Sequence, residues 1–270
     1  MKYLFTIVLS LLLISCNDAA KQEKTMPVEP NGGMGDGAPS IGHALVQAIE
    51  KAHHKKEFME HKAVSFDLEV KFGGKERIAG NLTMLTNSGK VRIEKSNGES
   101  LIFDGSSTYI TPEDADASGA RFDTFTWAYF FSFPYKLSDP GTLVTPMQND
   151  SLMGKSYTTF KLEFDQDTGD SPKDWYVGYL NKNNQVRAAA YIVTFNKSLD
   201  KAEASPHAIM YSGYKEIDGI PIAHHWEFYN WNKEQGITGA PIGMASINNL
   251  KFLSPDDGFF SRPEKAKVTD

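Results

Sequence analysis

Val64-Ser-Phe-Asp-Leu-Glu-Val-Lys-Phe72 alternates an apolar residue with a polar or charged one at every position. Because successive side chains of a β-strand point to opposite faces of the sheet, this stretch predicts a strand with one face in a core and the other in water. Such an alternation is typical of antiparallel sheets, whose two faces meet different surroundings. The stretch therefore indicates an antiparallel β protein.

Tight turns and short strands follow this first strand. Turn-forming pairs recur at Gly73-Gly74, Ser88-Gly89, Asn97-Gly98 and Asp104-Gly105. They separate apolar runs that predict strands over 78–86, 91–95, 101–103 and 108–110. Connections of hairpin length cannot join parallel neighbours, so these strands are expected to form an antiparallel meander.

A helix is expected before the first strand. Ser40 follows Pro39 and is a good helix N-cap. The stretch Ile41–Ala52 places apolar side chains at three- and four-residue spacing, which gives one apolar stripe along a helix. The charged stretch 53–62 is expected to end this helix.

An aromatic segment interrupts the strands. Residues 121–133 are dense in aromatic side chains, and their spacing spreads these side chains over every face of a helix. A helix that is apolar all round must be covered on several sides, so we expect other elements to pack around it. Pro134, Pro140 and Pro146 predict a loop after it.

Strand patterns resume and continue towards the carboxyl end. Alternation predicts strands around Phe160–Phe164, Trp175–Tyr179, Tyr191–Phe195, Ile209–Tyr211, His224–Phe228 and Ile247–Phe252. About ten or eleven strands are expected in total, with helices only near the start and over 121–133. We expect one domain over 40–262, mainly β with a few helices, followed by a flexible tail over 263–270.

The first fifteen residues have the composition of a secretion signal. Lys2 is followed by the apolar run Leu4–Ile14, which as a helix would span roughly 16 Å, about half of a bilayer core of about 30 Å. This run is too short to cross a membrane and predicts a signal peptide over 1–15. Residues 16–39 contain almost no large apolar side chains, which predicts a disordered tether before the domain.

The junction Leu13-Ile-Ser-Cys16 resembles the bacterial lipobox. The resemblance implies cleavage before Cys16 and attachment of lipid chains such as palmitate to this residue. Cys16 is the only cysteine of the chain, so the domain is expected to be held by its core without disulfides. Several acyl chains, at about 0.8 kcal/mol per buried CH₂, would make the attachment essentially permanent. We therefore expect a lipoprotein of the cell envelope. Asn17 differs from the aspartate that retains some lipoproteins at the inner membrane, which favours the outer membrane.

The sequence contains no motif of a known catalytic or metal centre. The patterns H-E-x-x-H and G-x-S-x-G are absent, and His224 and His225 are adjacent on a strand and so face opposite sides. The acidic pairs lie in turn-like stretches and are interpreted as turn formers. The formal net charge of −6 argues against nucleic-acid binding. We expect no enzyme, no cofactor and no metal site; the alternative for the metal is a site assembled from distant strands.

The order of elements resembles the lipoprotein-carrier superfamily, the LolA- and LolB-like half-barrels. The likeness rests on the opening helix 41–52, the alternation of 64–72, the aromatic segment 121–133 and the turn Asp218-Gly219 ahead of Trp226. It is a likeness of layout without a strict motif, and it extends to uncharacterised outer-membrane lipoproteins of Bacteroidota. It implies a single antiparallel sheet curved into an incomplete β-barrel, with a helical plug or lid beside an apolar cavity. Because a soluble shuttle has no lipobox, it also implies an anchored acceptor.

The surplus of aromatic residues on a curved sheet predicts an apolar ligand, a lipid or an acyl chain. We expect the ligand to contact Phe66, Leu68, Phe122, Phe125, Trp127, Tyr129, Phe130, Phe131, Trp175 and Trp226. In the alternative, the aromatic segment simply fills the barrel, and the chain is a structural or interaction module of an outer-membrane assembly. Both hypotheses attach the protein to the membrane through lipidated Cys16 and leave any protein partner and the side of the membrane open.

Overall fold

The computed structural model describes residues 40–269. The predicted signal peptide, the lipidation of Cys16 and the tether of 16–39 lie outside these residues. The stretch Pro39–Asp270 forms one compact unit. A unit of this size with its own hydrophobic core is expected to fold on its own.

The helices and strands have these bounds. Strands β1 to β5 are Ala63–Phe72, Lys75–Leu85, Val91–Lys95, Ser100–Phe103 and Thr108–Thr111. Strands β6 to β13 are Thr142–Leu152, Lys155–Phe164, Tyr176–Leu180, Val186–Tyr191, His207–Ile217, Ile220–Asn232, Gly236–Leu253 and Lys267–Val268. The helices are α1 (Ile41–Ala52), α2 (Lys55–Glu60), α3 (Ala120–Ser132), the 3-10 turn η1 (Phe133–Tyr135) and α4 (Leu199–Glu203).

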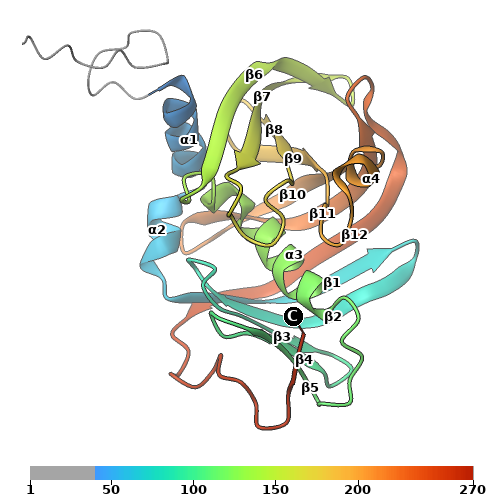
Figure 1. Cartoon of the computed structure of the whole chain (residues 1–270). Coiled ribbons are helices and arrows are strands. Elements are labelled where there is room, and N and C mark those ends of the chain that lie inside the picture. The colour runs from blue at the N-terminus through green and yellow to red at the C-terminus, as the bar shows by residue number, and fades with distance from the viewer. Residues whose placement is uncertain (1–39, 270) are drawn as a thin grey trace, which may run out of the picture. The chain divides into compact units, whose positions relative to one another are not determined.

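One antiparallel sheet forms most of this unit (Figure 1). Within residues 40–269 it has thirteen strands in the order β13-β5-β4-β3-β2-β1-β12-β11-β10-β9-β8-β7-β6. Two meanders, β1–β5 and β6–β12, are joined where β1 pairs with β12. The two end strands, β13 and β6, do not pair with each other in this part of the chain, so the sheet is open. This confirms the predicted fold class, a mainly β protein with an open half-barrel.

The alternation of 64–72 forms β1 as predicted. Phe66, Leu68 and Val70 are buried on one face, and Glu69 and Lys71 are exposed on the other. β1 pairs with β2 on one side and with β12 on the other, so it lies in the middle of the sheet. The strand that the sequence marks most clearly is therefore the one that joins the two meanders.

The predicted first helix is confirmed as α1. The hydroxyl of its N-cap, Ser40, accepts a hydrogen bond from the His43 backbone N–H over 3.1 Å. The chain leaves α1 through His54, which has a left-handed φ of 54°, and then forms α2, which the sequence does not predict. Within this charged stretch Phe58 is fully buried, and its ring stacks on Tyr135 at 4.0 Å. The buried Phe58 ring therefore holds α2 against the core, although the charged sequence of this stretch gave no helix prediction.

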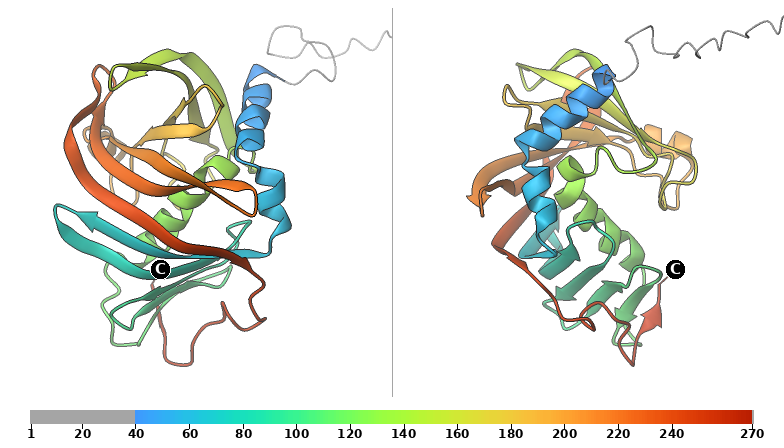
Figure 2. Two further views of the ribbon diagram at one scale, coloured as in Figure 1. Left: turned by 180° about the vertical axis from the view of Figure 1, so that it is seen from behind. Right: turned by 90° about the vertical axis from the view of Figure 1, so that its left-hand side faces the viewer.

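The helix predicted over 121–133 is confirmed as α3. It lies on the concave side of the sheet, between the two meanders (Figures 1 and 2). Trp127, Ala128 and Phe131 on one face of α3 belong to the main hydrophobic core. Tyr211 of β10 fastens the helix by donating a hydrogen bond from its hydroxyl to the Phe130 carbonyl over 2.9 Å.

Several further segments differ from the sequence prediction. The strand predicted over Tyr191–Phe195 ends at Tyr191, because β9 lies earlier, over Val186–Tyr191. Pro146 lies inside β6 and not in a loop, because β6 is an edge strand, where the missing N–H can face solvent. The short helix α4 was not expected. Lys267 and Val268 pair with Ile110 and Tyr109, so this part of the predicted flexible tail is a strand. Strands β6 and β13 bring the described total above the ten or eleven expected.

Candidate functional site

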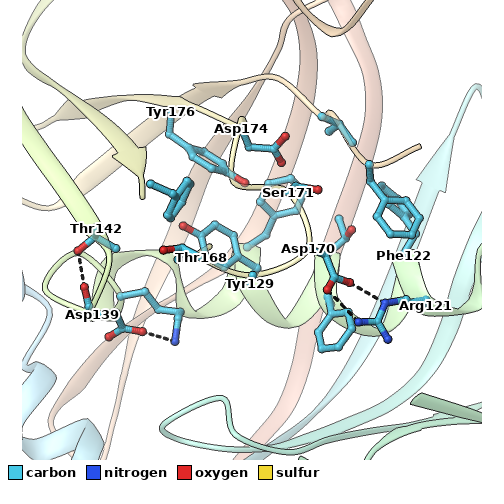
Figure 3. Close-up of a pocket in the computed structure, with 18 of the residues that line it drawn as sticks. Arg121, Phe122, Tyr129, Asp139, Thr142, Thr168, Asp170, Ser171, Asp174 and Tyr176 are labelled. Atoms are coloured by element: carbon cyan, nitrogen blue, oxygen red, sulfur yellow. Dashed lines mark hydrogen bonds and ion pairs between the residues drawn. The ribbon is translucent and has the colours of Figure 1, made fainter. Parts of the chain in front are cut away.

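A cavity of about 500 Å³ lies beside α3 in the described part of the chain. One wall is α3 itself. The others are the β7–β8 loop (residues 165–174), the segment 136–142 that leads into β6, and residues 193–195 after β9. Figure 3 shows side chains from these segments gathered around one space. Ligand pockets in proteins have volumes of about 300–1,000 Å³, so this cavity has the size of a binding site.

Aromatic rings line the interior of the cavity. They come from α3, from strands β4, β7 and β8, and from the segment after β9: Phe103, Phe122, Phe125, Tyr129, Phe130, Phe164, Tyr176 and Phe195. The rings support one another, with centroids 5.4 Å apart for Tyr129 and Tyr176 and 4.9 Å apart for Phe103 and Phe125. A wall of packed rings is apolar and stiff, which suits a hydrocarbon chain.

The helical period explains why α3 supplies so much of this wall. The cavity-lining positions on α3 are 121, 122, 125, 126, 129 and 130, which share one face of a helix. The opposite face carries the core residues Trp127 and Phe131. Both faces of α3 are therefore apolar for different reasons, since one packs in the core and the other borders the cavity.

Four of the predicted ligand contacts line the cavity, namely Phe122, Phe125, Tyr129 and Phe130. The other six lie elsewhere. Those buried in the main core are Phe66, Leu68, Trp127, Phe131 and Trp226. Trp175 packs against a second, smaller cluster, with its ring centroid 5.9 Å from that of Trp231. Five of the six are therefore residues of the main core, and the sixth packs against the second cluster.

Two ion pairs, which the sequence does not predict, lie at the polar rim of the cavity. The Arg121 guanidinium donates from Nε and Nη2 to the two carboxylate oxygens of Asp170, at 2.6 and 2.8 Å (Figure 3). Lys136 Nζ lies 2.5 Å from Asp139 Oδ2. The two residues of the Arg121–Asp170 pair are 49 residues apart in the sequence, so no local pattern points to it.

The β7–β8 loop is fastened beside the cavity at Gly141 as well. The Asp165 backbone N–H donates to the Gly141 carbonyl over 2.8 Å. A Cβ at Gly141 would lie 2.2 Å from Thr168 Oγ1, and the φ of this glycine is +83°. Only glycine fits both the backbone and the neighbour at this position. The loop therefore has two fixed points, one at Gly141 and one at Arg121.

Neutral polar groups also face the cavity. Burial raises the pKa of the Tyr129 and Tyr176 hydroxyls, so both stay protonated. Among residues 40–269, the buried Tyr129 hydroxyl has no hydrogen-bond partner. Asp174 accepts hydrogen bonds from the Thr194 N–H and hydroxyl, both at 2.7 Å. These bonds lower the pKa of its carboxyl, but burial has the larger effect and the pKa is raised.

The buried histidines have partners inside the protein. Nε2 of His53 accepts from the Val186 N–H over 3.0 Å, and burial lowers the pKa of this imidazole to about 3. Nδ1 of His224 lies 2.7 Å from the Ile247 carbonyl, while His225 faces the opposite, exposed side as predicted. A void of about 20 Å³ beside His53 has room for about one water molecule.

Residues 40–269 contain neither a candidate metal cluster nor a candidate membrane-spanning helix. No group of three or more His, Cys, Asp and Glu side chains lies close enough together to hold a metal ion. No helix in this range has the length and hydropathy needed to span a bilayer.

Comparison with solved structures finds similar folds at low sequence identity. A LolA superfamily protein from Nitrosomonas europaea has 10% identity and a TM-score of 0.49, over 80% of this chain and 97% of that chain. A Vibrio parahaemolyticus domain described as an outer membrane lipoprotein-sorting protein domain has 11% identity and a TM-score of 0.48, over the same shares. A DUF1329 family protein from Desulfovibrio piger has 12% identity and a TM-score of 0.43, again over 80% and 97%.

Sequence comparisons add no relative. No protein-family model and no curated protein sequence matches the chain. The predicted likeness to a lipoprotein family of Bacteroidota finds no support in the structural matches. The structural matches are likenesses of fold alone.

Proposed function

We propose that the domain binds a lipid or an acyl chain in the cavity beside α3. The observation that carries this proposal is a cavity of about 500 Å³ whose interior is lined by aromatic rings. A completely filled interior would favour the alternative, a structural or interaction module, and the open volume favours a ligand. The proposed role is binding, and it needs no catalytic residue.

The free energy gained by burying an acyl chain in such a cavity is of the same order as the cost of association. Each CH₂ group that moves from water into an apolar site contributes about 0.8 kcal/mol, so a chain of about 16 carbons contributes on the order of 10 kcal/mol. Loss of translational and rotational freedom opposes binding by an estimated 4–15 kcal/mol. Burial of the chain exceeds this cost toward the lower end of the range, by a margin that allows both loading and release.

The proposal places this domain in the cell envelope. Cleavage before Cys16 and lipidation of that residue would anchor the chain, and outer-membrane attachment follows from the prediction made on Asn17. Residues 17–39 would then join the anchor to the domain. An anchored domain can receive a lipid from a neighbour but cannot carry it between membranes.

Native mass spectrometry of residues 39–270, purified without detergent, tests the proposal. We expect a co-purifying lipid, or uptake of 1-palmitoylglycerol or palmitate by the empty domain. Thr126 lines the cavity from α3, so Thr126→Trp should fill part of it and weaken uptake by about tenfold or more. The matched control is Thr158→Trp on β7, which is exposed and does not line the cavity.

A domain that is empty as purified and takes up neither lipid would contradict the proposal. Equal uptake by the two tryptophan variants would place the binding site elsewhere. Far-UV circular dichroism of both variants separates loss of binding from loss of folding.

A further inference from the structure

The charges around the cavity determine which lipid headgroup it accepts. Among the residues that line it, two are cationic, Arg121 and Lys136, and three are acidic, Asp139, Asp170 and Asp174. With every carboxyl ionised, the formal sum is 2 − 3 = −1. The lining therefore carries no excess of positive charge for an anionic headgroup.

Both cations are already paired. Arg121 bonds both carboxylate oxygens of Asp170, its Nη1 donates to Thr108 Oγ1 over 3.1 Å, and its guanidinium carbon lies 5.1 Å from the centre of the Phe125 ring. Lys136 is held by Asp139, three residues along the chain. A fatty-acid carboxylate or a lipid phosphate would have to displace one of these carboxylates or share its cation. In either case the anionic headgroup and the carboxylate lie close together and repel each other.

Asp174 adds to this barrier. It is largely buried, and burial raises the pKa of its carboxyl, while Thr194 and the more distant charge of Lys197 favour the ionised form. In its ionised form it repels an anionic headgroup. In its protonated form it offers a neutral hydrogen-bonding group. Neither form adds a positive charge to the lining.

The remaining polar groups of the lining are neutral. They are the hydroxyls of Ser106, Thr126, Tyr129, Thr142, Thr168, Ser171 and Tyr176. Hydroxyls donate to and accept from esters and alcohols, and such bonds do not depend on a charge on the ligand. The lining thus combines apolar rings with neutral hydrogen-bonding groups and satisfied ion pairs.

We propose that the cavity selects a neutral lipid, an acyl chain that carries ester or hydroxyl groups, over a lipid with an anionic headgroup. This inference rests on the proposed function, because it names the class of ligand for the same cavity. The paired cations are the feature that sets the preference.

Two probes with the same acyl chain test this selectivity. Binding of 1-palmitoylglycerol and of palmitate to residues 39–270 is measured by competition at about pH 8, below the concentration at which either lipid forms micelles. We expect 1-palmitoylglycerol to bind at least about tenfold more tightly. Equal affinities, or tighter binding of palmitate, would overturn the inference and leave the proposed function intact. Failure of both lipids to bind counts against the proposed function itself.

Asp139→Asn is the variant that isolates the charge effect. It frees Lys136 without touching the Arg121–Asp170 pair, so the affinity for palmitate relative to that for 1-palmitoylglycerol should rise about three- to tenfold. Glu94→Gln is the matched control, because it makes the same change in net charge and frees Arg92, which does not line the cavity. An unchanged preference in Asp139→Asn, or the same change in both variants, would refute the role of the paired cations.

Discussion

At the scale of single residues, His53 shows how burial sets the chemistry of a side chain. It is 1% exposed, and its Nε2 accepts a hydrogen bond from Val186. Burial first, and the charge of His54 second, lower the pKa of the imidazole to about 3. Since a protonated Nε2 could not accept this bond, the neutral form is part of the folded structure.

We expect the free energy of unfolding to fall as the pH drops below 6.5. His53 takes up a proton near pH 6.5 in the unfolded chain but only near pH 3 in the folded protein, so the unfolded state binds more protons between these values. Stability is then present above pH 6.5 and is lost as the pH falls. From pH 6.5 to pH 5 the loss due to His53 is about 2 kcal/mol. Urea unfolding at pH 7 and pH 5 measures it.

His53→Gln is the control for this prediction, because its amide oxygen can accept from Val186 but does not titrate. The loss between pH 7 and pH 5 should be about 2 kcal/mol smaller in this variant. His207 and His224, whose pKa values burial also lowers, contribute with the same sign and remain in both proteins. An equal loss in the two proteins would show that His53 is not the group that titrates.

At the scale of elements, α2 depends on one residue. Phe58 is 0% exposed and is stacked on Tyr135 of η1, so it joins α2 to the segment that follows α3. We expect Phe58→Ala to lower the free energy of unfolding by about 3–5 kcal/mol, because it leaves a cavity in the core. The neighbouring Met59→Ala, at a residue that is 41% exposed, should cost less than about 1 kcal/mol. Urea denaturation measures the free energy of unfolding of both variants. Similar losses in the two would contradict the anchoring role of Phe58.

The β7–β8 loop is the element most directly tied to access to the cavity. Its Asp170 bonds Arg121 of α3, in a pair whose side chains are 35% and 25% exposed. A partly exposed pair contributes about 1 kcal/mol or less, so Asp170→Ala should raise the rate of loop opening about two- to fivefold. Limited proteolysis or hydrogen exchange within 165–174 measures this rate. The exposed Asp167→Ala in the same loop is the control, and equal rates for both variants would mean that the ion pair does not hold the loop.

At the scale of the whole molecule, the two meanders share one core. The ring centroids of Phe66 of β1 and Phe131 of α3 are 4.5 Å apart. Those of Phe228 of β11 and Phe130 of the same helix are 5.8 Å apart. The helix therefore packs against both halves of the sheet at once. Neither half can lose its packing on α3 without exposing apolar surface of the other.

This shared core predicts a single cooperative unfolding transition. Fluorescence of the four tryptophans reports on α3, the β8 region and β11, while far-UV circular dichroism reports on all strands. We expect the two urea-unfolding curves to coincide. A separate fluorescence transition would indicate that the β6–β12 meander unfolds independently of β1–β5.

Local structure was predictable wherever one side of an element meets the core and the other meets water. The alternation of 64–72 and the stripe of 41–52 place β1 and α1 because a burial pattern repeats with the period of the element. Strand β6 was missed because Pro146 usually ends a strand, and its tolerance depends on lying at the edge of the sheet. Position in a sheet is a property of the fold and leaves no mark on the strand itself.

The candidate site was predictable only in part. The aromatic segment pointed to the right helix, but an all-round apolar helix carries no signal of which face enters the core. Trp127 and Phe130 are close in the chain and both belong to the main core, yet only Phe130 also borders the cavity. The ion pair at the rim was not predicted, because Asp170 reaches Arg121 only when the β7–β8 loop folds over α3.

The sequence by itself determined the antiparallel strands and the apolar helix over 121–133, because side-chain periodicity records the surroundings of each element. The half-barrel and its plug were what the resemblance to the lipoprotein-carrier superfamily implied. The sequence is also the sole source for the signal peptide and for lipidation of Cys16, which stay predictions. Only the tertiary structure decided that a cavity remains beside α3 and that its cations are paired. The physical reason is that an unfilled volume and a long-range ion pair both depend on how separate elements meet, and neither has a period along the chain.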